Sequence, residues 1–174
     1  RLLGIHENGA YAQYTKASIK KLVHIPDELP DRIAALAEPF AVAYHVVHRS
    51  GLRMGEDALV IGGGPIGNVV GFMAKAVGAN VVISEPNAKR KANAEKLGFC
   101  TIDPMHDDMD ALVHKMTGGN GFDVVFEASG SKAGIVSTTK LCKIHGTIVP
   151  LALGAAPVDF ILGQVSFKEQ TVVG

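Results

Sequence analysis

Short apolar runs alternate with longer stretches of helical periodicity along most of this chain. Residues 57–61 form an apolar run typical of a strand buried on both faces, and residues 69–77 place apolar side chains at helical spacing before Gly78. Such an alternation predicts an α/β fold with a parallel sheet covered by helices on both faces. The expected strands are 57–61, 81–84, 100–102, 123–126, 147–151 and 171–173, and the expected helices are 31–37, 39–51, 65–77, 87–97, 107–116 and 131–143.

The first 30 residues follow a different pattern. They are polar and β-like, because residues 9–15 alternate in polarity, and Pro26 and Pro30 interrupt any regular element. We therefore expect two parts: residues 1–30, and an α/β domain over residues 31–174.

Three glycines stand between the first expected strand and the helix that follows it. Gly62, Gly64 and Gly67 have the spacing Gly-x-Gly-x-x-Gly, the fingerprint of a dinucleotide-binding βαβ unit. Gly62 permits the tight turn, Gly64 lets the backbone approach a pyrophosphate, and Gly67 lets the helix pack on the sheet. Pro65 suits the first helical turn, whose unpaired N–H groups would face the phosphates. A glycine turn without a ligand is the alternative interpretation.

An acidic residue completes the fingerprint. Glu85 ends the second expected strand about 20 residues beyond the glycines, where it can accept hydrogen bonds from the adenosine ribose. Its carboxylate would repel a 2′-phosphate, so the sequence predicts NAD rather than NADP. Lys89 and Arg90 follow and could soften that preference, or they belong to an ordinary basic face of the helix that Asn87 caps. Strand, glycines, helix, strand and acid together favour the dinucleotide site.

Composition narrows the function classes. The chain has 174 residues, 47% hydrophobic, with 17 basic and 17 acidic side chains, so it lacks the basic excess expected for nucleic-acid or membrane-surface binding. No apolar stretch is long enough to span a bilayer, and the first residues are not a secretory signal. Cys100 and Cys142 form no Cys-x-x-Cys pair, which suits a reducing, cytoplasmic setting. Because the chain begins with Arg1, we expect a piece of a longer protein.

Several segments, in order, resemble the zinc-dependent medium-chain dehydrogenase/reductase family, especially its polyol, butanediol and threonine dehydrogenase branches. The segments are 9–14, 35–40, 74–79, 126–130 and 168–174. The resemblance implies a Rossmann domain, a doubly wound parallel sheet, over residues 31–174. It also implies that residues 1–30 are a short β-rich remnant of the family's GroES-like catalytic domain. The family's zinc ligands lie upstream of anything present here, so no catalytic residue is expected within this chain.

The resemblance and the sheet topology also indicate site residues. Ligands gather at the carboxyl ends of parallel strands, so the ends of the fourth and fifth strands should line the nicotinamide side. In relatives, a glutamate at the position of Glu38 lies beside the zinc or binds it; the alternative is a solvated glutamate favoured by the helix dipole. His45 and His48 are three residues apart without a further ligand, so we assign them a structural role. The predicted cofactor-binding residues are Gly62, Gly64, Pro65, Ile66, Gly67, Glu85, Arg90, Ala128, Ser129, Leu151 and Ala152, and Glu38 is the predicted metal ligand.

The function that the resemblance implies is that of an NAD-dependent alcohol or polyol dehydrogenase. In the complete enzyme, hydride would pass between a secondary alcohol or polyol and the nicotinamide, with zinc polarising the substrate oxygen. This chain alone would bind and orient the cofactor without turnover. A homodimer or homotetramer is expected, because the family pairs its sheets edge to edge and residues 147–151 should lie near a sheet edge.

Three other functions share parts of this pattern. A short-chain dehydrogenase needs a Tyr-x-x-x-Lys pair after the glycines, but Tyr11, Tyr14 and Tyr44 all precede Gly62. A methyltransferase rarely keeps the third glycine, Gly67. A standalone NAD-binding sensor without catalysis stays open from the sequence alone.

Overall fold

The computed structural model describes residues 3–153 and 157–174. They fall into two compact units, residues 1–36 and 37–174, so the first unit ends six residues beyond the boundary expected from the sequence. The described part of the first unit contains η1 (Ile19–Lys21) and α1 (Asp31–Ala34). An isolated bridge between Leu3 and Glu7 is the β pairing found there, so the β-rich character expected for residues 1–30 is not observed in residues 3–30. Alternation alone does not make a strand, because the backbone also needs a neighbouring strand to pair with.

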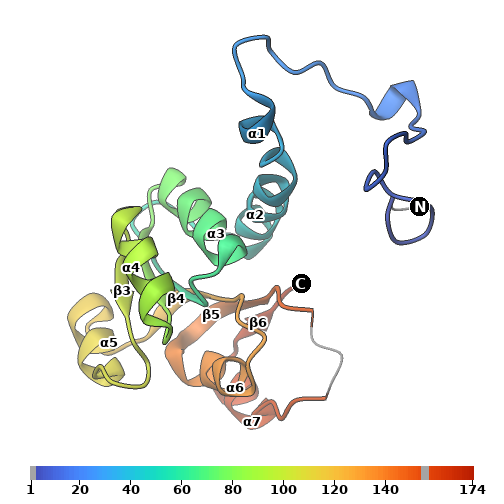
Figure 1. Ribbon diagram of the computed structural model, residues 1–174. Helices are drawn as coiled ribbons and strands as arrows, with labels where there is room; N and C mark the ends of the chain where they lie inside the picture. Colours follow the sequence, from blue (N-terminus) through green and yellow to red (C-terminus); the bar gives the residue numbers. More distant parts are fainter. Residues whose placement is uncertain (1–2, 154–156) are drawn as a thin grey trace. The chain divides into compact units, whose positions relative to one another are not determined.

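The second unit is built on a six-stranded parallel sheet in the order β3-β2-β1-β4-β5-β6. Figure 1 labels β3, β4, β5 and β6 of this sheet. This order confirms the predicted doubly wound Rossmann sheet, whose order reverses between β1 and β4. The strands are β1 (Asp57–Ile61), β2 (Asn80–Ser84), β3 (Cys100–Ile102), β4 (Phe122–Glu127), β5 (Cys142–Pro150) and β6 (Thr171–Val172).

Helices cover both faces of the sheet because successive strand residues point to opposite sides. Ala58 and Val60 of β1 pack in one buried cluster with residues of α2, α3 and α4, while Leu59 and Ile61 pack in the other with residues of α5 and α6. None of the helices in the described ranges is long and apolar enough to cross a membrane. The helices are α2 (Ala37–Ser50), α3 (Pro65–Ala76), α4 (Ala88–Lys96), α5 (Met109–Thr117), α6 (Lys132–Leu141) and α7 (Leu162–Phe167).

The structure differs from the predicted elements at α7, which the sequence did not predict, and at the junction of α6 and β5. The helix ends at Leu141 and the strand begins at Cys142, five residues before the predicted start at Thr147. Lys168 Nζ donates to the carbonyls of residues 139, 140 and 142 at 2.8–3.0 Å, and Gln170 Nε2 donates to those of residues 139, 142 and 143. These distant side chains satisfy the carbonyls that end the helix. Residues 147–151 lie near the sheet edge, as expected, with β6 as the edge strand.

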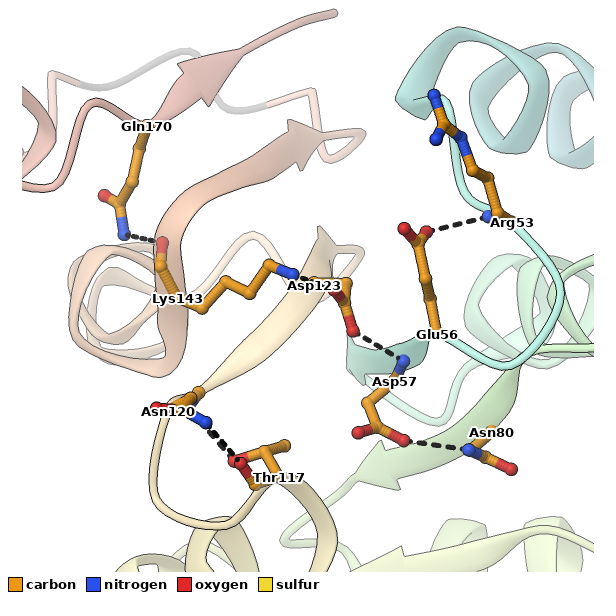
Figure 2. A network of polar contacts seen from close by, with 10 residues as sticks. Arg53, Glu56, Asp57, Asn80, Thr117, Asn120, Asp123, Lys143 and Gln170 are labelled. Carbon is orange, nitrogen blue, oxygen red and sulfur yellow. Dashed lines mark hydrogen bonds and ion pairs between the residues drawn. The ribbon is translucent and has the colours of Figure 1, made fainter.

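Charged and amide side chains tie together the amino ends of the central strands (Figure 2). Asp123 accepts a hydrogen bond from the backbone N–H of Asp57 at 2.8 Å and pairs with Lys143 of β5. Asn80 donates to the Asp57 carboxylate at 2.9 Å. The Asp123–Lys143 ion pair raises the pKa of Lys143, and the hydrogen bond between the two side chains is the largest cause. Side chains therefore satisfy one another at this edge of the sheet.

Candidate cofactor-binding site

A cavity of about 650 Å³ opens at the carboxyl ends of β1, β2 and β4, the opposite edge of the sheet from the Asp123–Lys143 pair. It lies where the strand order reverses, which is where open α/β sheets bind ligands. Its size suits a small organic ligand or one part of a larger one. The lining residues are Ile61, Gly62, Gly64, Ser84, Glu85, Pro86, Arg90, Pro104, Met105, Met109, Ala128, Ser129, Ser131, Ala133, Gly134, Ser137, Lys140 and Leu141.

Each glycine of the turn has a distinct geometric constraint. Gly62 has φ +108°, a conformation that other residues rarely adopt, and a Cβ there would lie 3.0 Å from the backbone of Ala128 and Ser129. A Cβ on Gly67 would lie 1.8 Å from the Gly62 carbonyl oxygen, so the helix can approach the strand only with glycine. These two observations confirm the predicted tight turn and close packing.

Gly64 differs because no protein atom lies within 4 Å of the Cβ it lacks. It is the N-cap of α3 and has no side chain that could accept hydrogen bonds from the N–H groups of the first turn, which begins with Pro65. The N–H groups of that turn are thus available to an anion, and the open space over Gly64 leaves room for one. The geometry fits the predicted pyrophosphate contact.

Glu85 follows β2 and is 4% exposed. Its Oε2 accepts a hydrogen bond from the Gly63 N–H and its Oε1 one from the Asn87 N–H, both at 2.8 Å. The carboxylate therefore joins the glycine turn to the start of α4, where the Asn87 side chain caps the helix as predicted. Since each carboxylate oxygen has two acceptor positions, both retain capacity for a ligand hydroxyl.

Glu127, the last residue of β4, received no role from the sequence and is 1% exposed. Its Oε1 accepts hydrogen bonds from the Ser129 hydroxyl at 2.5 Å, the Ser129 N–H at 3.0 Å and the Gly130 N–H at 3.1 Å. Its backbone carbonyl accepts from Leu151 at 2.8 Å and Ala152 at 3.2 Å. The side chain of Glu127 therefore fixes the turn after β4, and its backbone carbonyl fixes the end of β5. The sequence feature that could have identified Glu127 is an acidic residue at the end of an apolar strand, as at Glu85.

The outer wall of the cavity is a loop held by exposed polar contacts. Asp103 pairs with His106 at 2.9 Å, and Asp107 pairs with Lys91 of α4 at 3.1 Å. The pKa of Asp103 lies below its usual value, first because of the hydrogen bond with His106 and next because of the Met105 N–H. Tertiary structure alone brings this loop to the cavity, so sequence periodicity gave no signal for it.

The structure brings six of the eleven predicted cofactor residues into the cavity lining: Gly62, Gly64, Glu85, Arg90, Ala128 and Ser129. The other five, Pro65, Ile66, Gly67, Leu151 and Ala152, lie outside that lining. Ile66 and Leu151 pack against the buried cluster on the α2–α4 face of the sheet. Cofactor contact by all eleven residues stays a prediction.

The predicted metal ligand, Glu38, is exposed in the first turn of α2. In the described ranges, 3–153 and 157–174, no three His, Cys, Asp or Glu side chains gather closely enough to hold a metal ion. The ring of His48 stacks on Tyr44, with the ring centroids 6.1 Å apart. The described residues therefore do not form a zinc site by themselves, and the role of Glu38 as a metal ligand stays a prediction.

Known proteins are similar to this chain in sequence and in fold. A family described as zinc-binding dehydrogenase matches residues 65–174. The 2-dehydro-3-deoxy-L-galactonate 5-dehydrogenase of Pseudoalteromonas atlantica is 39% identical over 174 residues, which cover 100% of this chain and 51% of that protein. The chain thus spans about half the length of the curated relatives it matches.

Solved structures agree with this assignment. The 2R,3R-butanediol dehydrogenase of Bacillus subtilis superposes with a TM-score of 0.79 at 36% identity, covering 86% of this chain and 44% of that one. A Sinorhizobium meliloti protein crystallised with NADP gives a TM-score of 0.87 at 31% identity, covering 99% of this chain and 52% of that one. This chain belongs to the zinc-dependent medium-chain dehydrogenase family, and it contains that family's cofactor-binding domain.

Proposed function

We propose that this chain binds NAD(H) for a dehydrogenase that acts on a secondary alcohol, polyol or sugar acid. The main support is the open α3 N-terminus over Gly64, with the carboxylate of Glu85 hydrogen-bonded to the adjoining Gly63. Phosphates and ribose hydroxyls of a dinucleotide need this combination of free N–H donors and a neighbouring acceptor. Two relatives are named as dehydrogenases of a 2-dehydro-3-deoxy-L-galactonate and of 2R,3R-butanediol, and these names support the substrate class.

In this proposal, each group has a binding or orienting role. The first turn of α3 takes the pyrophosphate, Glu85 accepts from the adenosine ribose, and Arg90 lies beside the adenine ribose. Ala128, Ser129 and the end of β5 form the nicotinamide side. Bound nicotinamide supplies hydride transfer, and the protein fixes the ring in place and excludes water around it.

The preference for NAD over NADP is the finer part of the proposal. The carboxylate of Glu85 would repel a 2′-phosphate, although a Sinorhizobium relative was crystallised with NADP. Calorimetric titration of the chain with both dinucleotides measures the preference. We expect NAD(H) to bind at least roughly tenfold more tightly, and Glu85→Gln, which keeps the side-chain volume, to narrow that gap.

Glu95→Gln is the matched control, because Glu95 is an exposed glutamate of α4 whose Oε1 accepts from Thr101 and which does not line the cavity. It should leave both affinities unchanged. Equal or tighter NADP(H) binding by the unsubstituted chain would reject the NAD preference, and an absence of binding by either dinucleotide would reject the proposed function.

Assembly and compartment belong to the same proposal. We propose a cytoplasmic homodimer or homotetramer that pairs its sheets through the β6 edge, where Val172 is 46% exposed. An unpaired strand edge with apolar side chains favours association with a second copy. The mass of the chain by light scattering measures the assembly.

A further inference from the structure

We infer that Glu127 is a fixed negative charge that strengthens the binding of the oxidised, positively charged nicotinamide relative to the reduced one. The inference rests on the proposed function, since it requires a nicotinamide at the carboxyl edge of the sheet. Beyond binding of the dinucleotide, the inference concerns how the site distinguishes the oxidised from the reduced form of that ligand. The argument depends on the hydrogen bonds of Glu127, its ion pairing and its place in the sheet.

The hydrogen bonds of Glu127 are those of an ionised carboxylate. Oε1 accepts from the Ser129 N–H, the Ser129 hydroxyl and the Gly130 N–H, and Oε2 accepts from the same Gly130 N–H at 3.2 Å. Three of these four contacts come from backbone N–H groups, which can only donate and therefore stabilise the charged form of a carboxyl. The Ser129 hydroxyl also lies 3.0 Å from the Ser131 hydroxyl, so either of its two neighbours can take its proton. The backbone donors thus favour the anionic side chain.

The charge of Glu127 has neutral partners. Among the residues that the structure describes, none of the ion pairs includes Glu127, and every polar contact given for its side chain comes from a neutral N–H or O–H. The contrast is Asp123 at the other end of the same strand, which pairs with Lys143. A buried charge without a counterion exerts a stronger and longer-ranged field than a paired, solvated one.

The charge lies directly behind the wall of the candidate site. Glu127 pairs in register with Ile61 of β1 and Pro150 of β5, so it stands at the point where the strand order reverses. Ser129, one hydrogen bond away, lines the cavity. The Glu127 carbonyl also holds Leu151 and Ala152 at the end of β5, on the side proposed for the nicotinamide.

Oxidised and reduced nicotinamide have nearly the same shape but differ by one positive charge on the ring. Contacts to adenine, ribose and phosphates are common to both forms and cancel in the ratio of their affinities. A fixed anion nearby stabilises the oxidised form alone. Two unit charges about 10 Å apart at an effective dielectric constant near 20 change that ratio on the order of tenfold.

The test is Glu127→Gln in the full 174-residue chain, with dissociation constants for NAD⁺ by calorimetry and for NADH by fluorescence. We expect the ratio Kd(NAD⁺)/Kd(NADH) to rise on the order of tenfold. The glutamine also disturbs the turn, because its amide N–H would face the Gly130 N–H, but that disturbance weakens both forms alike. Titration with ADP-ribose, which lacks the nicotinamide, measures the shared part directly.

Three further variants keep the test decisive if the glutamine variant does not fold. Glu127→Met removes the charge without placing an N–H against the Gly130 N–H and should raise the ratio, whereas Glu127→Asp keeps the charge and should not. Ser129→Ala keeps the carboxylate and should change both affinities equally.

The outcomes separate the two claims. A ratio that stays within twofold of the parent's in Glu127→Gln, or in Glu127→Met where the glutamine variant does not fold, with both nucleotides still bound, overturns the inference and leaves the proposed function intact. Failure of the unsubstituted chain to bind NAD⁺ and NADH rejects the proposed function itself. A raised ratio with an unchanged affinity for ADP-ribose supports the fixed charge.

Discussion

The two ends of the same parallel sheet treat their acidic residues in opposite ways. At the amino end, Asp123 pairs with Lys143 and Asp57 with the Asn80 amide, so side chains from neighbouring strands satisfy one another. At the carboxyl end, Glu85 and Glu127 are 4% and 1% exposed and accept hydrogen bonds from backbone N–H groups and one serine hydroxyl. The amino end is internally satisfied, while the carboxyl end keeps acceptor capacity beside a cavity.

This difference indicates which end serves stability and which serves binding. A carboxylate paired with a lysine has its charge compensated within the protein, whereas one held by N–H donors keeps its net charge and its field. Substitutions at the amino end should therefore change the free energy of unfolding with little effect on ligand affinity. Substitutions at the open carboxyl end should do the reverse, except where the backbone is packed tightly.

The largest effect on the free energy of unfolding should come from Gly67, where the backbone is packed tightly. In Gly67→Ala the new Cβ would meet the Gly62 carbonyl oxygen at 1.8 Å, so we expect a loss of more than about 3 kcal/mol of unfolding free energy, or failure to fold. Gly64→Ala is the matched control, because its φ is −72° and no protein atom lies within 4 Å. It should change stability by less than about 1 kcal/mol yet weaken dinucleotide binding at least roughly tenfold.

Urea denaturation and calorimetry on the same two variants measure both quantities. Equal stability of the two variants would show that the helix can move away from the strand. Unchanged NAD(H) affinity in Gly64→Ala would remove the turn from the binding site.

A smaller effect is expected at the amino end from Asp123→Ala. The change leaves the Asp57 N–H without its acceptor and Lys143 without its partner, and should cost about 2 kcal/mol of unfolding free energy. Affinity for NAD(H) should stay within twofold. The control is Asp159→Ala, which breaks the exposed Asp159–Lys132 pair and should cost less than about 0.5 kcal/mol. A loss of affinity in Asp123→Ala would contradict the division between the two ends.

The smallest effect should come from the exposed loop at the cavity wall. The pKa of Asp103 is lowered on folding from an unfolded value of 3.8, first by His106 and then by the Met105 N–H. The stability it contributes is therefore present above pH 3.8 and is lost as the pH falls through the lower, folded pKa. Thermal melts should place Asp103→Asn slightly below the parent chain at pH 6, and the two curves should converge in acid. A difference that persists below the folded pKa would contradict this account.

Much of the fold could be predicted because local signals and tertiary structure agree. The apolar run of β1 has its predicted bounds, 57–61, and Asn87 caps α4 with its own side chain. Gly62 and Gly67 occupy positions where a Cβ would clash, which the spacing of the motif had indicated. In these places the residue type itself determines the backbone geometry.

The rest depends on partners that are distant in sequence. Strand β5 starts early because Lys168 and Gln170 donate hydrogen bonds to the carbonyl of Cys142. The hydrophobic periodicity around Cys142 does not indicate these two distant partners. Glu127 resembles Glu85 as an acid after an apolar strand, but it lacked the spacing from the glycine motif that singled out Glu85. Its role is visible only when Ser129 and Gly130 fold back onto it.

The reach of Lys168 and Gln170 also has a consequence for synthesis of the protein. These residues satisfy the carbonyls at the end of α6, which precede them by 26 to 31 positions. At about 5–20 residues per second, a ribosome needs roughly 1–6 seconds to add that many residues. During that interval β5, with Ile148 and Val149, has no β6 beside it and α6 has no completed end. This side of the sheet can therefore form only after residues 168–172 have been made, later than the strands β1 and β2.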